Sequence, residues 1–165
     1  DPQFTLNMYN HMGVNPGYAG SHNGICATAM IREQWMGFEG APSTQLFNFH
    51  SSFKLFGLNH GAGLSFINET AGFNENVKVN IAYAYRKAVG QGTLGLGANM
   101  GVHNLTFDSG GELLAPDGTQ GSSMSDVAVP SDGDNDIAFD FGIGAFYKTE
   151  KVYLGVSSLH LNQPR

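Results

Sequence analysis

The sequence has few charged residues, no long apolar run and a single cysteine. Charged residues make up 13% of the chain, about half of the usual share, and the net charge of −6 argues against nucleic acid as a partner. No stretch approaches the roughly 18 consecutive apolar residues of a membrane helix, and no helical period persists. Cys26 has no second cysteine to pair with, which excludes an intramolecular disulfide framework.

Motifs for catalysis, cofactors and metal ions are missing as well. The string from Gly95 to Met100 lacks the third glycine of a dinucleotide-binding loop, and no nucleophile elbow occurs. The six histidines show neither the H-x-x-x-H nor the H-E-x-x-H spacing of common metal sites. Residues 132–136 resemble the first half of a calcium loop, but Ile143 stands where its bidentate glutamate would be. We therefore expect no catalytic residue, no metal site and no cofactor.

What the sequence does contain is a strict alternation of apolar residues with small or polar ones, clearest over residues 77–104. A period of two places each set on its own face of a sheet. One face is apolar, and the other carries charge, asparagine and many of the 23 glycines, about twice the usual number. A soluble core would not carry such a second face. The pattern is typical of a transmembrane β-barrel with a polar lumen.

The alternation assigns individual side chains to lipid or to the lumen. We expect these residues to face lipid: Val77, Val79, Ile81, Tyr83, Ile137, Phe139, Phe141 and Ile143. We expect these residues to face the lumen: Lys78, Asn80, His103 and Asp140. The lipid bilayer is thus the first partner that the sequence predicts.

Seven segments show the alternation, and we predict strands at residues 22–35, 44–54, 57–68, 77–87, 93–105, 136–148 and 151–162. Long and short connections alternate, the long ones being residues 36–43, 67–76 and 106–135. Outer-membrane barrels have short periplasmic turns and longer extracellular loops. We therefore expect these three connections to be extracellular and the N-terminus to be periplasmic. Residues 1–21 form an N-terminal periplasmic-side segment in this interpretation, and residues 22–165 the N-terminal half of an outer-membrane β-barrel.

Seven strands would leave both edges of the sheet unpaired. In hydrocarbon each unpaired backbone group costs several kcal/mol, and bacterial single-chain barrels have even strand numbers. We expect about seven further strands beyond Arg165, which would give a barrel of about 14 strands. The opening string Asp1-Pro2-Gln3 is what a mature terminus would show after removal of an export signal.

Aromatic residues gather near the predicted strand ends, as they do in the girdles that barrels carry at both membrane interfaces. The candidate interface aromatics are Trp35, Tyr83, Tyr85, Tyr147 and Tyr153. Aromatic packing in the core of an ordinary β-domain is the alternative explanation.

Two long strings resemble the PorP/SprF family. The first is Asn15-Pro16-Gly17-Tyr18-Ala19-Gly20-Ser21, and the second is Arg32-Glu33-Gln34-Trp35-Met36-Gly37-Phe38-Glu39-Gly40-Ala41-Pro42. The closing Ser158-Leu159-His160-Leu161-Asn162-Gln163-Pro164 agrees as well. The resemblance implies an outer-membrane protein tied to the type IX secretion system and to gliding motility. The implied partners are large adhesins or other cargo with a C-terminal secretion signal, together with other secretion or gliding components.

Each string has two interpretations. In the second string, Arg32, Trp35, Gly37, Phe38, Glu39 and Gly40 could form a recognition surface for a partner, or a strand-end turn with an interface tryptophan. The N-terminal motif consists of Asn15, Pro16, Tyr18 and Gly20. Proline and glycine in it indicate a turn at or within the periplasmic mouth, which either anchors the terminus or acts as a plug.

Three functions therefore stay open at the level of sequence. The first is a barrel that supports secretion and surface anchoring of type IX cargo. The second is a porin-like or fatty-acid-transporter-like barrel that conducts small solutes, and the third is a soluble β-sandwich binding domain. Copurification with a secreted partner, conductance in planar bilayers and dependence on detergent would separate them.

Overall fold

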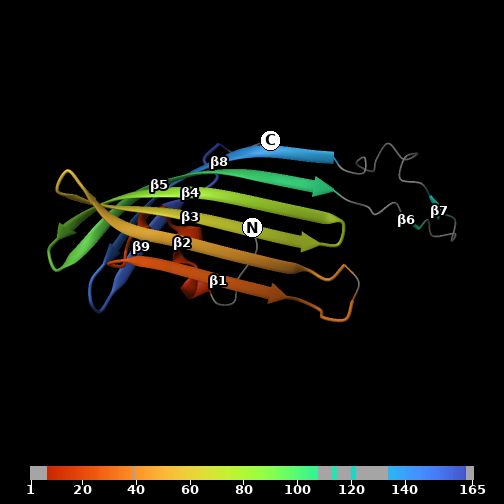
Figure 1. The fold of residues 1–165 in the computed structure, drawn as a ribbon, viewed down its shortest axis with the longest axis horizontal. Coiled ribbons are helices and arrows are strands. Elements are labelled where there is room, and N and C mark those ends of the chain that lie inside the picture. Colours follow the sequence, from red (N-terminus) through yellow and green to blue (C-terminus); the bar gives the residue numbers. More distant parts are fainter. Residues whose placement is uncertain (1–6, 39, 108–112, 115–119, 122–133, 163–165) are drawn as a thin grey trace.

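The structure, a computed structural model, describes residues 7–38, 40–107, 113–114, 120–121 and 134–162. Seven strands form one antiparallel sheet in the order β1-β2-β3-β4-β5-β8-β9 (Figure 1). They are β1 (Ile25–Glu33), β2 (Ser43–Leu55), β3 (Leu58–Ala71), β4 (Asn74–Val89), β5 (Gly92–Phe107), β8 (Asp134–Lys148) and β9 (Tyr153–Ser158). The predicted all-β antiparallel fold is confirmed.

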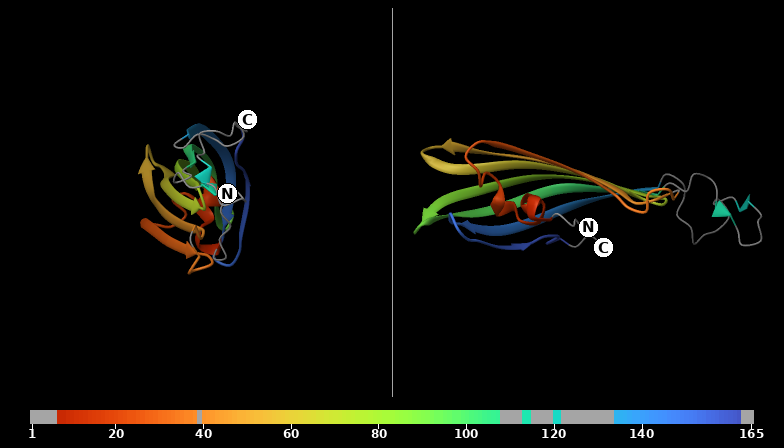
Figure 2. Two further views of the ribbon diagram at one scale, coloured as in Figure 1. Left: turned by 90° about the vertical axis from the view of Figure 1, so that its right-hand side faces the viewer. Right: turned by 90° about the horizontal axis from the view of Figure 1, so that it is seen from below.

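The sheet curves into half of a barrel, and the N-terminal segment lies on its concave side (Figure 2). From residue 7 on, where the structure describes it, this segment contains three short helices: η1 (Asn7–Tyr9), α1 (His11–Val14) and η2 (Pro16–Tyr18). The sequence did not predict them, because three or four residues are too few for a helical period. Within the described residues, no helix combines the length and the apolar character needed to cross a bilayer.

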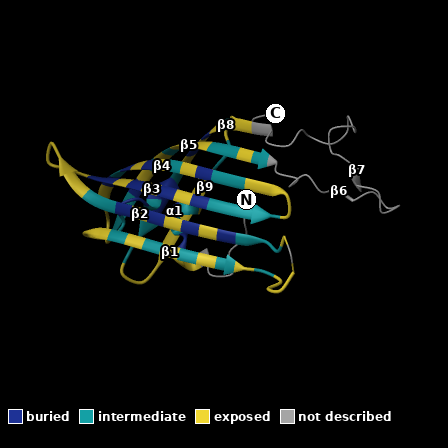
Figure 3. Ribbon diagram, turned by 45° about the vertical axis from the view of Figure 1, so that its right-hand side comes forward, coloured by how far each residue is buried: buried dark blue, intermediate teal, exposed yellow. Residues whose placement is uncertain are grey.

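Burial in the sheet is the reverse of that in a soluble protein. On β4 the side chain of Lys78 is 6% exposed, whereas Ile81, on the opposite face of the same strand, is 59% exposed. Figure 3 shows the resulting bands of buried and exposed residues along the strands. All eight side chains expected to face lipid lie on the convex face, as the register of β4 against β5 and of β5 against β8 requires. The convex face is apolar and the concave face is polar.

One predicted loop is wrong. Residues 67–76 are not a long connection, because β3 continues to Ala71, β4 begins at Asn74, and only Gly72 and Phe73 lie between them. The polar residues of this stretch pair with each other across the two strands, for example Glu69 with Asn76. Gly72 supports the tight turn with a positive φ of 59°. Long and short connections therefore do not alternate without exception.

Other boundaries moved by a few residues. The connection predicted at residues 106–135 shortens, because β5 ends at Phe107 and β8 begins at Asp134. It contains a small two-stranded sheet, β6 (Leu113–Leu114) with β7 (Gln120–Gly121), that the sequence did not predict. Strand β1 begins at Ile25 instead of residue 22, and β9 covers only Tyr153–Ser158 of the predicted 151–162.

Candidate functional site on the concave face

A row of small residues crosses the middle of the concave face. The register pairs Gly61 of β3 with Ala84 of β4, Ala84 with Gly97 of β5, and Gly97 with Gly144 of β8. Residues that are directly opposite each other share a face of the sheet. Four adjacent strands therefore present no side chain larger than a methyl group along this row, which lets another segment approach the backbone of the sheet.

The N-terminal segment occupies this row. A Cβ atom at Gly61 would overlap the carbonyl group of Ala19, and one at Gly97 would overlap the backbone of Pro16. Helix η2 contacts β4, β5 and β8. The glycines that the alternation placed on the polar face therefore have a second role beyond lining a lumen, because they admit the segment to the sheet.

Asn15 ties the segment to the last two strands. Its side-chain Nδ2 donates to the carbonyl oxygen of Ala145 at 3.0 Å and lies 3.4 Å from that of Val156, while its Oδ1 accepts from the backbone N–H of Gly17 at 2.9 Å. The third contact caps η2. One buried amide thus shapes the turn and holds it against β8 and β9.

Three more hydrogen bonds join the segment to other strands. Asn48 of β2 donates from Nδ2 to Oδ1 of Asn10 at 2.6 Å. Arg86 of β4 donates to the carbonyl oxygen of Ala19 at 3.3 Å, and Ser157 of β9 donates to that of Val14 at 2.6 Å. The segment is therefore attached to the edge strand β9, to its neighbour β8, to β4 in the middle of the sheet and to β2 near the other edge.

Aromatic rings fill the space beside η2. Tyr18 packs edge-on against Phe146 at 5.1 Å between ring centroids, and His11 lies 5.0 Å from Tyr18 and 5.2 Å from Tyr153. Burial raises the pKa of Tyr18, and burial, with a smaller contribution from Lys148, lowers the pKa of His11. Both groups are therefore uncharged at neutral pH.

One of the candidate interface aromatics, Tyr153, lies on the concave face, so its assignment to the membrane interface was wrong. The register pairs it with Lys148 on the concave face, and its ring contacts those of His11 and Phe146. Tyr153 thus packs on the N-terminal segment and does not lie on the outer surface. The sequence could not separate the two cases, because proximity to a short turn says nothing about the face.

The other candidate aromatics near the short turns lie on the convex face. Tyr83 forms a 2.6 Å hydrogen bond with Nδ1 of His60, and the His60 ring also packs against Tyr85 and Phe53. Tyr147 donates to the carbonyl oxygen of Val89 at 3.1 Å. The sequence missed His60, which supplies a polar partner within this outer aromatic cluster.

The four side chains expected to face the lumen all lie on the concave face. Lys78 is directly opposite His103, and Asn80 is directly opposite Gly101, whose other partner is Asp140. Asp140 pairs with His160 at 3.0 Å between Oδ1 and Nδ1. Nε2 of His103 is buried without a hydrogen-bond partner among the described residues. Such a face suits contact with water or with a polar chain.

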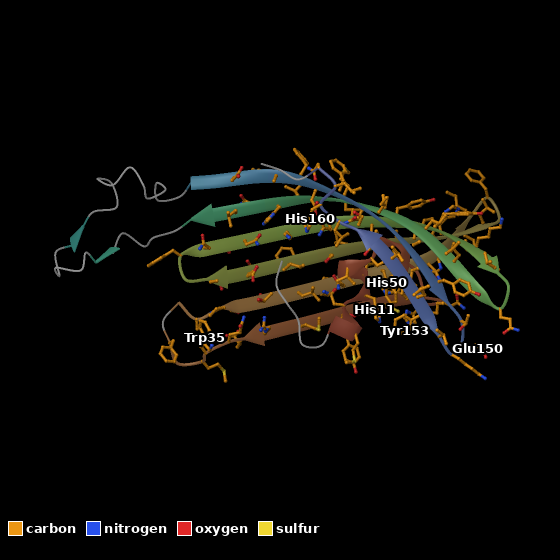
Figure 4. The ribbon with its side chains drawn as sticks, turned by 180° about the vertical axis from the view of Figure 1, so that it is seen from behind. His11, Trp35, His50, Glu150, Tyr153 and His160 are labelled. Atoms are coloured by element: carbon orange, nitrogen blue, oxygen red, sulfur yellow. The ribbon has the colours of Figure 1, made fainter. Side chains whose placement is uncertain are left out.

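The residues of the proposed recognition surface separate into two groups. Trp35 and Phe38 are 72% and 76% exposed in the connection between β1 and β2, and Gly37 and Gly40 have positive φ angles. Figure 4 shows Trp35 at the end of β1, away from His11, His50 and Tyr153. Arg32 instead lies on the concave face, and Glu39 is outside the described residues.

The connection that carries Trp35 has a defined shape. The backbone N–H of Gln34 donates to the carbonyl oxygen of Pro42 at 2.9 Å, and that of Gly72 donates to the carbonyl oxygen of Gly40 at 3.0 Å. The second bond joins the connection to the turn between β3 and β4. Trp35 and Phe38 are therefore presented on a braced loop.

One group of side chains in the described part of the chain could hold a metal ion, contrary to the expectation from histidine spacing. It consists of His22, Cys26 and His50, whose potential ligand atoms all lie within 4.8 Å of one another. The search for paired histidines missed it, because one ligand is a cysteine and because Cys26 and His50 meet only through the register of β1 against β2. The spacing His22-x-x-x-Cys26 was the available signal.

Comparison with known proteins gives one match. The model of a family described as "Type IX secretion system membrane protein PorP/SprF" matches residues 1–165. The searches of curated proteins and of solved structures return no match to the chain.

Proposed function

Because the chain belongs to the PorP/SprF family of type IX secretion system membrane proteins, we propose that it supports secretion and surface anchoring of type IX cargo such as gliding adhesins. In this proposal the barrel acts by binding and not by chemistry. Its convex apolar face contacts the lipid of the outer membrane. The end of the barrel that carries residues 34–42 and the long connection between β5 and β8 faces outward.

The observation that carries this proposal is the exposed apolar loop between β1 and β2. Trp35, Met36 and Phe38 are 72%, 83% and 76% exposed, and backbone hydrogen bonds brace the loop. Large apolar and aromatic side chains on a fixed support are typical anchors of protein–protein interfaces. The same loop belongs to the string that carries the family resemblance, so we assign cargo or a secretion component to it as partner.

The N-terminal segment favours this proposal over a conducting pore. It lies on the concave face, where a solute would have to pass, and is attached there by the side chains of Asn10, Asn15, Asn48, Arg86 and Ser157. We therefore assign the segment the role of a plug that also anchors the terminus. The porin-like alternative predicts substantial conductance in planar bilayers despite this segment.

The test is copurification from the native host with tagged barrel. The double variant Trp35→Ala/Phe38→Ala should lose a cargo protein or secretion component that the unaltered barrel retains, by about tenfold or more, since loss of two interface anchors costs about 2 kcal/mol or more. Phe56→Ala is the matched control, because Phe56 is 93% exposed in the short turn between β2 and β3. Equal retention by the double variant and the control would contradict the assignment of the loop.

A further inference from the structure

The register of β1 against β2 builds a cluster of nitrogen and sulfur ligands on the concave face. Cys26 is directly opposite His50, and such pairs have Cβ atoms about 4.5–5.5 Å apart. His22 lies in the chain that leads into β1, with its ring centroid 5.9 Å from that of His50. The potential ligand atoms of the three residues lie within 4.8 Å of one another.

The surroundings of two side chains in the cluster, His50 and His22, favour binding of a ligand. His50 is only 5% exposed, and its Nδ1 is buried without a hydrogen-bond partner among the described residues. A buried polar atom without a partner is unfavourable, so a ligand bound to this nitrogen would stabilise it. Nδ1 of His22 lies 3.2 Å from Oγ of Ser21, a contact that orients the ring as outer-shell partners of metal ligands do.

The surroundings add sulfur to the cluster. The three residues line a pocket of about 440 Å³ that Met8 and Met12 also line. Met12 packs on Gly63, close to His50, and the thiol of Cys26 forms no disulfide. Imidazole, thiol and thioether groups suit copper(I) and zinc, whereas magnesium and calcium require oxygen ligands.

We propose that His22, Cys26 and His50 bind a thiophilic transition-metal ion, Zn²⁺ or Cu⁺. Tetrahedral nitrogen and sulfur ligands at 2.0–2.3 Å from zinc lie about 3.3–3.8 Å apart. The ligand atoms therefore need to approach by at most about 1 Å, a shift of the size that side-chain rotation provides. Three protein ligands leave a fourth position for water or a thioether.

The ion would fasten the N-terminal segment to the sheet. His22 lies four residues after the end of η2 at Tyr18, whereas Cys26 and His50 belong to paired strands. Coordination of one ion by all three residues would link the end of the N-terminal segment to β1 and β2. The inference is independent of the proposed cargo, since it concerns the inner face and not the exposed loop.

The experiment uses the full chain in detergent, stripped of metal with a chelator. Co²⁺ is titrated first, because a thiolate ligand gives it a sulfur-to-cobalt charge-transfer absorption band. Zn²⁺ is then added as a competitor, and Cu⁺ is titrated separately against a chromogenic chelator under reducing conditions. We expect one equivalent of cobalt with the charge-transfer band and displacement by Zn²⁺, or one equivalent of Cu⁺.

Three variants decide the result. Cys26→Ser should abolish the band, and His22→Gln should weaken binding by more than the roughly 10–100-fold that loss of an outer-shell partner costs. His160→Gln, on the far part of the concave face beside Asp140, should bind like the unaltered chain. His22 is exposed, so its replacement leaves the barrel folded. Unchanged affinity in Cys26→Ser and His22→Gln, or no binding of either metal to the unaltered chain, would overturn the proposal.

Discussion

The contact between Gly61 and the N-terminal segment allows a direct test of how the segment is held. A methyl group added by Gly61→Ala would overlap the carbonyl group of Ala19 and the backbone nitrogen of Gly20. All the atoms that the methyl group would meet belong to the backbone, so no flexible side chain can move aside. Overpacking of this kind costs about 1–3 kcal/mol. The cost applies only while the N-terminal segment is docked, that is, packed against the concave face of the sheet.

The docking contacts set the scale for this cost. Four side-chain hydrogen bonds, made by Asn15, Asn48, Arg86 and Ser157, attach the segment to the sheet. At about 0.5–1.5 kcal/mol each they contribute roughly 2–6 kcal/mol. A strain of about 1–3 kcal/mol therefore removes a large part of the docking energy. It should raise the undocked population about 5- to 150-fold, since 1.4 kcal/mol corresponds to a factor of ten.

Limited proteolysis with chymotrypsin measures this population. Cleavage after Tyr18 requires release of η2, because the Tyr18 ring packs against Phe146 and His50. When opening and closing are fast, the cleavage rate follows the undocked population. Ala62→Val is the control, since Ala62 is the next residue of β3 on the exposed convex face. Equal cleavage rates in Gly61→Ala and in the unaltered chain, or an equal rise in the control, would refute the reasoning.

Three further predictions concern the faces, the topology and pH. Arginine at Ile81 or Phe141 should cost roughly 2–4 kcal/mol of barrel stability and arginine at Asn80 much less; urea titrations in detergent that rank them the other way would contradict the face assignment. Protease added to whole cells should cut within residues 106–135 and spare the turn at 88–92, whereas cleavage only after the outer membrane is opened would reverse the proposed topology. Burial lowers the pKa of His11 in the docked state, so the undocked state binds more protons below the ordinary pKa of about 6.5. Docking of the N-terminal segment on the sheet should therefore be complete above pH 6.5 and weaken on acidification. The mobility of a spin label at Val14 should report this change. The same response in His11→Gln would exclude His11 as its cause.

The sequence predicted the existence of the seven strands and the faces of β4 and β8, because both follow from local periodicity. On β4 the alternation of Val79 and Ile81 with Lys78 and Asn80 requires no knowledge of the partner strands. The two-residue turn after β3 was missed for a related reason. Asn68, Glu69 and Asn76 are polar and indicated a loop, but they pair across the strands and extend the ladder.

The site itself depends on information that a periodic pattern does not carry. Glycine at position 97 indicates a polar or small face but not what packs on it, so docking of Pro16 could not be predicted from it. Cys26 and His50 are 24 residues apart and meet only through the register of β1 against β2. The face of Tyr153 likewise follows from its pairing with Lys148 and not from its distance to a turn.

Spin labels at two adjacent residues of β4 test most directly whether the convex face contacts lipid. In a Cys26→Ser background, cysteine is introduced at Ile81 or at Asn80, which lie on opposite faces of the strand, and the labelled chain is placed in lipid bilayers. The label at position 81 should be accessible to oxygen dissolved in the bilayer and shielded from a water-soluble nickel complex, and the label at position 80 should not be accessible to the lipid phase. Equal access of the nickel complex to position 81 would contradict a membrane-spanning sheet.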